Sequence, residues 1–279
     1  MHRVSRPSEE QDRFAVDLRC LTWSERGDGR QGVVRCELGG QTVALKFYGR
    51  KRRFLRSQLR DLGHRVYRQR SGTGLWERQR TERETLDLWR REGFHTPRCA
   101  ELLDCPAGWE VPFLVLEWIE APSMWDLIEV GDPSPEGVER MTWLAQELGR
   151  RHDRVLEATE PRLLHQHPIL EHVLLDGDRL VTIDHELVSI CSDRLDEQVG
   201  RELMGWIRSI YQSSLSRITV SAFCDAYPAR DRLLGEMERL GRNGLTHARA
   251  WLRRVRRKRG RPSRGDLVEV LREWQEKTA

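Results

Sequence analysis

Three histidines and one aspartate flank a short predicted β-hairpin in the middle of the chain. Residues 173–175 are apolar, an Asp-Gly pair supplies a tight turn, and residues 180–183 form a β-branched returning strand. The polar residues directly before and after this hairpin are His165, His167, His172 and Asp184. Because the open ends of a hairpin lie together, we expect these side chains to reach one place and build a site. The alternative is a surface hairpin with incidental histidines, and the rest of the chain decides between the two.

A glycine-rich segment stands between two predicted strands in the N-terminal half. Its spacing is Gly-x-Gly-x-x-Gly-x-Val, with glycines at Gly27, Gly29 and Gly32. A turn of this kind between antiparallel strands lets backbone amides approach phosphates closely, whereas the dinucleotide-binding version joins a strand to a helix. The next strand contains Val-Ala-Leu-Lys, which ends at Lys46. This ordered pair resembles the glycine loop and phosphate-pairing lysine of a protein-kinase-like fold.

A helix predicted over residues 75–92 supplies the glutamate that such a lysine requires. The segment consists of helix-forming residues, and Glu82 and Glu84 are both candidate partners. We predict that Glu84 holds Lys46, because it precedes the apolar packing face of the helix and should therefore look inward. The alternative is that Glu84 is one of several surface carboxylates on a charged helix.

The strands give way to helices after residue 120. Residues 113–120 read as an edge strand that runs into a linker, and in a kinase-like hinge the backbone near Glu117 and Ile119 would bind adenine. We predict an α+β, two-lobed fold, with a small antiparallel β lobe that carries one helix and a larger, mostly helical lobe. The predicted divisions are a flexible leader over 1–13, a nucleotide-binding lobe over 14–117, and a helical lobe with the catalytic loop and a basic tail over 118–279.

The order of these landmarks resembles the protein-kinase-like superfamily over about residues 20–190. In that superfamily the catalytic loop reads His-x-Asp, then four residues, then Asn, and a hairpin follows that ends in a metal-binding Asp. Here His165-Gln-His167, His172 and Asp184 occupy those places. An Ile-Asp pair without a following Phe-Gly, a histidine in the Asn position and abundant arginine resemble the bacterial lipopolysaccharide core (Kdo and heptose) kinases.

The resemblance implies an ATP-dependent phosphotransferase. The three glycines would cover the nucleotide phosphates, and Lys46 would contact them. Asp184 and His172 would hold Mg²⁺, and His165 would support the loop by hydrogen bonding. His167 would stand where the superfamily has its catalytic aspartate.

Two departures from the superfamily pattern concern these histidines. The imidazole of His167 can accept a proton near neutral pH, but it lacks the fixed negative charge that orients a hydroxyl. His172 presents nitrogen to a cation that prefers oxygen, which favours contact through water or a softer metal. Either histidine could instead be structural.

Composition limits the class of protein further. Of the 279 residues 33% are charged, and no apolar run reaches the roughly 20 residues of a membrane span. The N-terminus has no hydrophobic segment typical of a secretory signal, and the six cysteines contain no Cys-x-x-Cys pair. These features predict a cytoplasmic protein with reduced thiols.

The net charge of the chain is only +4, but basic residues cluster in two stretches, at residues 50–70 and 253–261. Such stretches attract polyanions, and with the resemblance they imply an anionic, lipid-linked sugar of the lipopolysaccharide core as acceptor, with peripheral contact to the inner membrane surface. An arginine-rich solvated face is the alternative reading.

Two other functions remain open at this stage. A pseudokinase that serves as a nucleotide-binding or regulatory module is suggested by His167 and His172, although Lys46, Glu84 and Asp184 argue against a pure scaffold. A helical nucleic-acid-binding protein rests on the arginine clusters alone, and we regard it as the weaker alternative.

Overall fold

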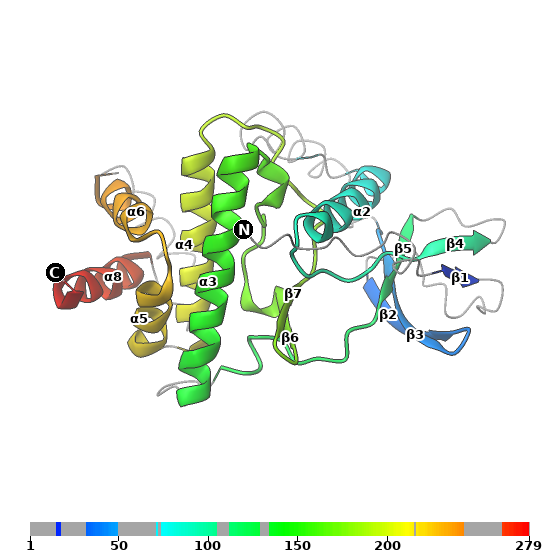
Figure 1. Cartoon of the computed structure of the whole chain (residues 1–279), viewed down its shortest axis with the longest axis horizontal. Coiled ribbons are helices and arrows are strands. Elements are labelled where there is room, and N and C mark those ends of the chain that lie inside the picture. The colour runs from blue at the N-terminus through cyan, green and yellow to red at the C-terminus, as the bar shows by residue number, and fades with distance from the viewer. Residues whose placement is uncertain are drawn as a thin grey trace, which may run out of the picture. The chain divides into compact units, whose positions relative to one another are not determined.

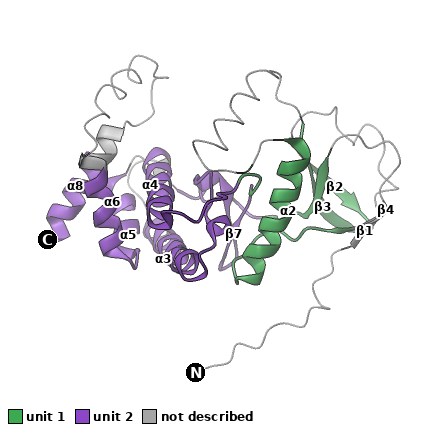
Figure 2. Ribbon diagram, turned by 90° about the horizontal axis from the view of Figure 1, so that it is seen from above, with its two compact units in different colours: residues 1–120, 185–187 green, residues 121–184, 188–279 purple. Residues whose placement is uncertain are grey.

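The computed structural model divides the chain into two compact units, which Figure 2 distinguishes by colour. Unit 1 consists of residues 1–120 together with 185–187, and unit 2 consists of residues 121–184 and 188–279. The residues that the structure describes are 15–17, 32–49, 71, 74–104, 112–128, 134–214, 216–242 and 264–278. The predicted leader over 1–13 and the predicted basic stretches at 50–70 and 253–261 lie outside the described residues.

Unit 1 is built on a three-stranded antiparallel sheet. Its strands, in spatial order, are β2 (Gly32–Leu38), β3 (Gln41–Phe47) and β5 (Phe113–Glu117) (Figure 1). Gly39 and Gly40 make the turn between β2 and β3 with φ values of 57° and 80°, which favour glycine over residues that carry a Cβ. A separate parallel pair is formed by β1 (Ala15–Asp17) and β4 (Glu101–Asp104).

The alternation of side chains along β3 gives the sheet two apolar faces. Val43, Leu45 and Phe47 belong to one buried cluster, whereas Ala44 and Tyr48 belong to a second cluster that includes Leu86 of the helix α2 (Leu75–Arg91). Because side chains alternate with a period of two, Lys46 faces the same way as Ala44 and Tyr48. The register of β3 therefore directs Lys46 toward α2.

Unit 2 is mostly helical. Its helices are α3 (Pro135–Ala158), α4 (Leu195–Ser214), α5 (Arg217–Ala226), α6 (Arg230–Arg242) and α8 (Arg264–Thr278) (Figure 1). The hydroxyl of Ser134 accepts a hydrogen bond from the amide of Gly137 at 3.2 Å and so caps α3. Trp206 and Trp274 are buried in the apolar core that these helices share.

The remaining elements of unit 2 carry the histidines. They are the 3₁₀ turns η2 (Pro161–Leu163) and η3 (Leu170–His172) and the antiparallel hairpin of β6 (Val173–Asp176) and β7 (Arg179–Thr182). The amide of Leu170 donates to the hydroxyl of Ser209 on α4 at 3.0 Å. A Cβ at Gly205 on α4 would lie 2.3 Å from Pro168, so the missing side chain lets the histidine-bearing loop approach α4 closely.

A buried polar network joins α3 to α4 inside unit 2. Glu202 forms an ion pair with Arg151, accepts a hydrogen bond from the indole of Trp206 at 3.0 Å and lies 3.4 Å from Nε2 of His152. The other ring nitrogen of His152 lies 2.8 Å from the hydroxyl of Tyr227. Buried charges are tolerated where they are paired and hydrogen-bonded in this way.

The predicted α+β class is confirmed: a small antiparallel sheet and the helix α2 lie in unit 1, and the described part of the larger unit is mostly helical. The hairpin predicted over residues 173–183 is present, with Gly177 in its turn at φ 63°. None of the helices in the described part of the chain is both long and apolar enough to cross a membrane.

Candidate functional site

A buried lysine–glutamate pair lies at the interface of β3 and α2 in unit 1. Nζ of Lys46 lies 2.8 Å from Oε1 and 2.7 Å from Oε2 of Glu82. The Lys46 side chain is 9% exposed and the Glu82 side chain 1% exposed. A pair of charges removed from water to this degree is costly unless both partners are held in good geometry.

Tyr48 gives Glu82 a second fixed partner. Its hydroxyl donates to Oε2 of Glu82 at 2.5 Å, and the backbone amide of His185 donates to Oε1 at 3.3 Å. Burial, and then the charge of Glu82, raises the pKa of Tyr48 far above its ordinary value, so its hydroxyl keeps its proton and remains a donor. The Glu82 carboxylate is thus fixed from three sides, by Lys46, Tyr48 and His185.

The prediction that Glu84 looks inward and holds Lys46 is wrong. Glu84 is exposed and lies 3.9 Å from Nε of Arg80, one turn earlier on the same helix. Glu82 is four residues before the buried Leu86 and therefore shares its face of α2, whereas Glu84 is rotated away from that face. The spacing to Leu86 was the signal in the sequence that identifies the correct residue.

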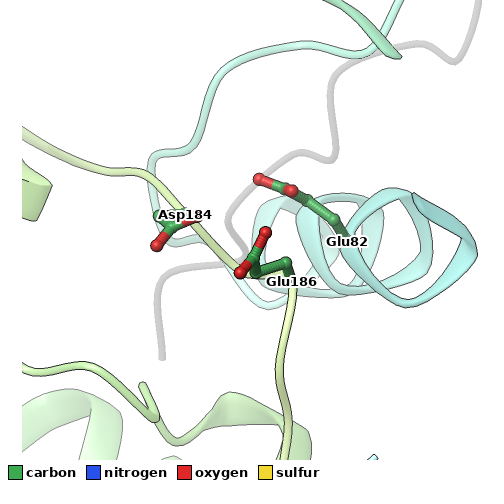
Figure 3. Close-up of side chains that lie close together, drawn as sticks. All are labelled: Glu82, Asp184 and Glu186. Atoms are coloured by element: carbon green, nitrogen blue, oxygen red, sulfur yellow. The ribbon is translucent and has the colours of Figure 1, made fainter. Parts of the chain in front are cut away.

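A second buried ion pair lies beside the first in unit 1. Arg78, one turn before Glu82 on α2, forms an ion pair with Glu186, and both side chains are less than a tenth exposed. Figure 3 shows Glu82 on α2 and Glu186 on the segment that follows Asp184. Carboxylate oxygens of Glu82 and Glu186 lie within 4.8 Å of each other, so Lys46 and Arg78 together neutralise two adjacent negative charges.

The histidine loop of unit 2 is held by hydrogen bonds between rings and backbone. Nε2 of His165 lies 2.9 Å from the carbonyl oxygen of Ile183, and Nδ1 of His165 accepts from the amide of His167 at 3.2 Å. These partners require the proton on Nε2. Burial, with a smaller contribution from the nearby His172, lowers the pKa of His165 to about 4, so the ring is neutral near pH 7. These contacts are of the kind that the predicted supporting role of His165 requires, and the role itself stays a prediction.

His172 and Asp184 lie together in unit 2. Nδ1 of His172 lies 3.1 Å from the carbonyl oxygen of His167 and must carry the proton to donate to it. Nε2 of His172, which then carries a lone pair in the neutral ring, lies 3.6 Å from Oδ2 of Asp184. A nitrogen and an oxygen donor at this separation can both bind one cation, and a protonated His172 would instead pair with the carboxylate.

His167 presents a different environment from the other two histidines. Its side chain is exposed, while its amide and its carbonyl oxygen contact His165 and His172. Its backbone therefore holds the loop together, and its imidazole is accessible to a substrate.

The remaining predicted site residues are placed as follows. Gly27 and Gly29 lie outside the described residues, and Gly32 begins β2 with open space where a Cβ would stand. Glu117 ends β5, and Arg98 donates to its carboxylate at 3.1 Å and 3.2 Å. Ile119 lies partly exposed in the linker after β5.

Three residues of unit 1 escaped the sequence reasoning. Tyr48 lies two residues after Lys46 on one strand, so the alternation of β3 could have identified it. Arg78 lies four residues before Glu82 and shares its helix face. Glu186 carried no such local signal, because its partner is 108 positions away in the sequence.

No protein-family model and no curated protein sequence matches the chain. Among solved structures, the chain is similar to one described as WaaP in complex with acyl carrier protein. The identity is 17%, the match covers 82% of this chain and 88% of the other, and the TM-score is 0.45.

Proposed function

We propose that the protein is an ATP-dependent kinase that transfers a phosphoryl group to an alcohol group of a lipopolysaccharide core sugar. The observation that carries this proposal is the buried Lys46–Glu82 pair. A lysine on the strand after a glycine-rich turn, held by a glutamate of the neighbouring helix, is the arrangement with which kinases contact nucleotide phosphates. Because burial of the pair is costly, a binding role for Lys46 accounts for it better than stability does.

The residues of unit 2 fit a divalent cation. Asp184 offers carboxylate oxygen, which Mg²⁺ prefers, and His172 offers Nε2 at 3.6 Å from that carboxylate. Nδ1 of His172 is tied to the His167 carbonyl, which fixes the ring orientation as metal-binding histidines require. A cation held by His172 and Asp184 would supply positive charge that offsets the negative charge of a nucleotide phosphate.

The transfer itself requires positioning more than proton removal. The acceptor oxygen forms a new bond to the γ-phosphorus as the bond to the ADP oxygen breaks, and the hydroxyl proton passes to the exposed imidazole of His167. His165 fixes the loop that carries His167 through its two backbone contacts. The arginine-rich composition and net charge of +4 favour an anionic acceptor, held at the inner membrane surface.

Nucleotide affinity, measured by calorimetry with and without Mg²⁺, tests this proposal. We expect Mg²⁺-dependent ATP binding by the wild type and a loss of at least about tenfold in Lys46→Ala and in Asp184→Ala. Arg80→Ala, which removes an exposed cation from α2, is the matched control and should bind as the wild type does. Undetectable ATP binding by the folded wild type would disprove the kinase assignment.

Turnover separates the kinase from a pseudokinase. The observation that favours the second candidate is an imidazole at position 167, which lacks the fixed charge of an aspartate. A kinase should consume ATP in the presence of core oligosaccharide acceptors, and His167→Ala should lower kcat while ATP affinity is kept. ATP binding without turnover on any core acceptor would favour a nucleotide-binding regulatory module.

A further inference from the structure

The segment directly after Asp184 is attached to α2 at three points. The carboxylate of Glu186 pairs with Arg78, the amide of His185 donates to Glu82, and the ring of His185 meets Trp89 edge-on at 4.3 Å between centroids. The helix residues involved are separated by four and seven positions, so they form one stripe along α2. His185 and Glu186 are thereby held against the part of α2 between Arg78 and Trp89.

The ion pair at the start of this stripe, Arg78–Glu186, is deeply buried, and a gain in stability does not explain why it is there. Arg78 and Glu186 are 6% and 7% exposed at their side chains. Replacing a buried pair with apolar groups of similar volume often leaves stability unchanged or raised, whereas a well-placed pair specifies one arrangement of its elements. Here the arrangement specified is that of the 185–186 segment on α2.

This arrangement constrains the two residues to which the proposed function gives the main roles. The helix residue that holds Lys46, Glu82, also receives the His185 amide. On the other side of the same peptide bond is Asp184, whose backbone has the left-handed φ of 67°. A shift of the segment along α2 would remove the His185 amide, a hydrogen-bond donor, from the Glu82 carboxylate.

We propose that Arg78 and Glu186 are positioning residues, whose ion pair fixes the segment 185–186 on α2 and so keeps the His185 amide on the Glu82 carboxylate that holds Lys46. The consequence for binding rests on the proposed function, because only a nucleotide and metal site makes use of that geometry. The pair acts through Glu82 and needs no contact with substrate.

The double variant Arg78→Met/Glu186→Leu separates positioning from stability, because it removes both charges and leaves no buried charge without its partner. We expect a thermal midpoint within a few degrees of wild type. Hydrogen exchange of the His185 amide, measured by NMR, should be about tenfold faster than in the wild type. A change of this size corresponds to loss of one hydrogen bond to a charged group, here the Glu82 carboxylate. The Mg²⁺-dependent ATP affinity should fall by a similar factor, about tenfold.

The matched control is Arg80→Met/Glu84→Leu, which removes the exposed pair from the same helix and should change neither exchange nor affinity. If the double variant of the buried pair does not fold, Glu186→Gln keeps the shape of the side chain and should show the same faster exchange at His185. Wild-type exchange at His185 in a folded variant would overturn the proposal.

The exchange measurement requires no nucleotide. If the wild type fails to bind ATP, the kinase assignment fails, while His185 exchange in the variants still decides whether Arg78 and Glu186 fix the segment. Faster exchange with unchanged ATP affinity would overturn the link between the ion pair and binding.

Discussion

His172 determines at the residue scale which cations suit the proposed metal site. Its Nδ1 is committed to the His167 carbonyl at 3.1 Å, so the nitrogen near Asp184 is Nε2. Imidazole nitrogen suits transition metals such as Mn²⁺ better than it suits Mg²⁺, which demands oxygen. A site with this donor pair should therefore be less selective for Mg²⁺ than a site made of oxygen ligands.

We expect the wild type to bind Mn²⁺ more tightly than Mg²⁺. His172→Asn should lower the ratio of the Mn²⁺ affinity to the Mg²⁺ affinity by about tenfold, because an amide oxygen replaces a nitrogen ligand. Calorimetric titration of each metal measures the difference. Pulsed electron paramagnetic resonance of bound Mn²⁺ should detect nitrogen coupling in the wild type alone. Coupling that persists in His172→Asn would contradict ligation by His172.

Tyr48→Phe should destabilise unit 1, because the buried Glu82 carboxylate loses a donor at 2.5 Å. Loss of a hydrogen bond to a buried charged group costs about 1–3 kcal/mol. Urea unfolding measures the effect. Tyr211→Phe, at a partly exposed tyrosine of α4, is the control and should lie near wild type. Equal stability of Tyr48→Phe and wild type would show that the Tyr48 hydroxyl adds nothing to the hold on Glu82.

At the scale of elements, two helical glycines should respond to alanine in opposite directions. A Cβ at Gly149, inside α3, would lie 2.1 Å from the ring of Pro228, while nothing lies within 4 Å of a Cβ at Gly235 in α6. We expect Gly149→Ala to destabilise by about 1–3 kcal/mol through overpacking. Gly235→Ala should stabilise by up to about 1 kcal/mol through helix propensity. Denaturant unfolding of both variants checks the signs, and a stabilising Gly149→Ala would refute the close approach.

Periodicity in the sequence predicts the elements but not the contacts between distant segments. The β6–β7 hairpin, α2 and the inward direction of Lys46 follow from local patterns. The choice between Glu82 and Glu84 failed because the charged helix was judged by its order in the sequence and not by rotation around its axis. The Arg78–Glu186 pair could not be predicted, because it depends on where the chain returns to α2 after more than a hundred residues.

At the scale of the whole molecule, the buried network of unit 2 links folding to pH. Burial opposes the charge of Glu202, but Arg151, with hydrogen bonds from His152 and Trp206, outweighs it and lowers the pKa of Glu202 to about 2. Burial also lowers the pKa of His152 below its ordinary value. Both groups therefore bind fewer protons in the folded state than in the unfolded state as the pH falls.

The sign of the resulting dependence is the same for both groups. His152 contributes stability that is complete above its unfolded pKa of about 6.5 and declines below it, and Glu202 contributes stability that declines from about pH 4.3 toward 2. Stability of the wild type should thus fall between about pH 6.5 and 5, by at most about 1.4 kcal/mol per pH unit for His152 alone. His152→Gln should show a shallower slope in urea unfolding across this range. An equal slope in both proteins would exclude His152 as the source.

The left-handed backbone of Asp184, with φ of 67°, sets stability and activity against each other. Glycine adopts this conformation freely, whereas a residue with a Cβ adopts it at a cost of roughly 1 kcal/mol. Asp184→Gly should consequently raise the free energy of unfolding while it removes the carboxylate at position 184. A laboratory evolution experiment that rewards only heat resistance would then favour glycine at position 184, whereas selection for the proposed phosphoryl transfer would retain aspartate.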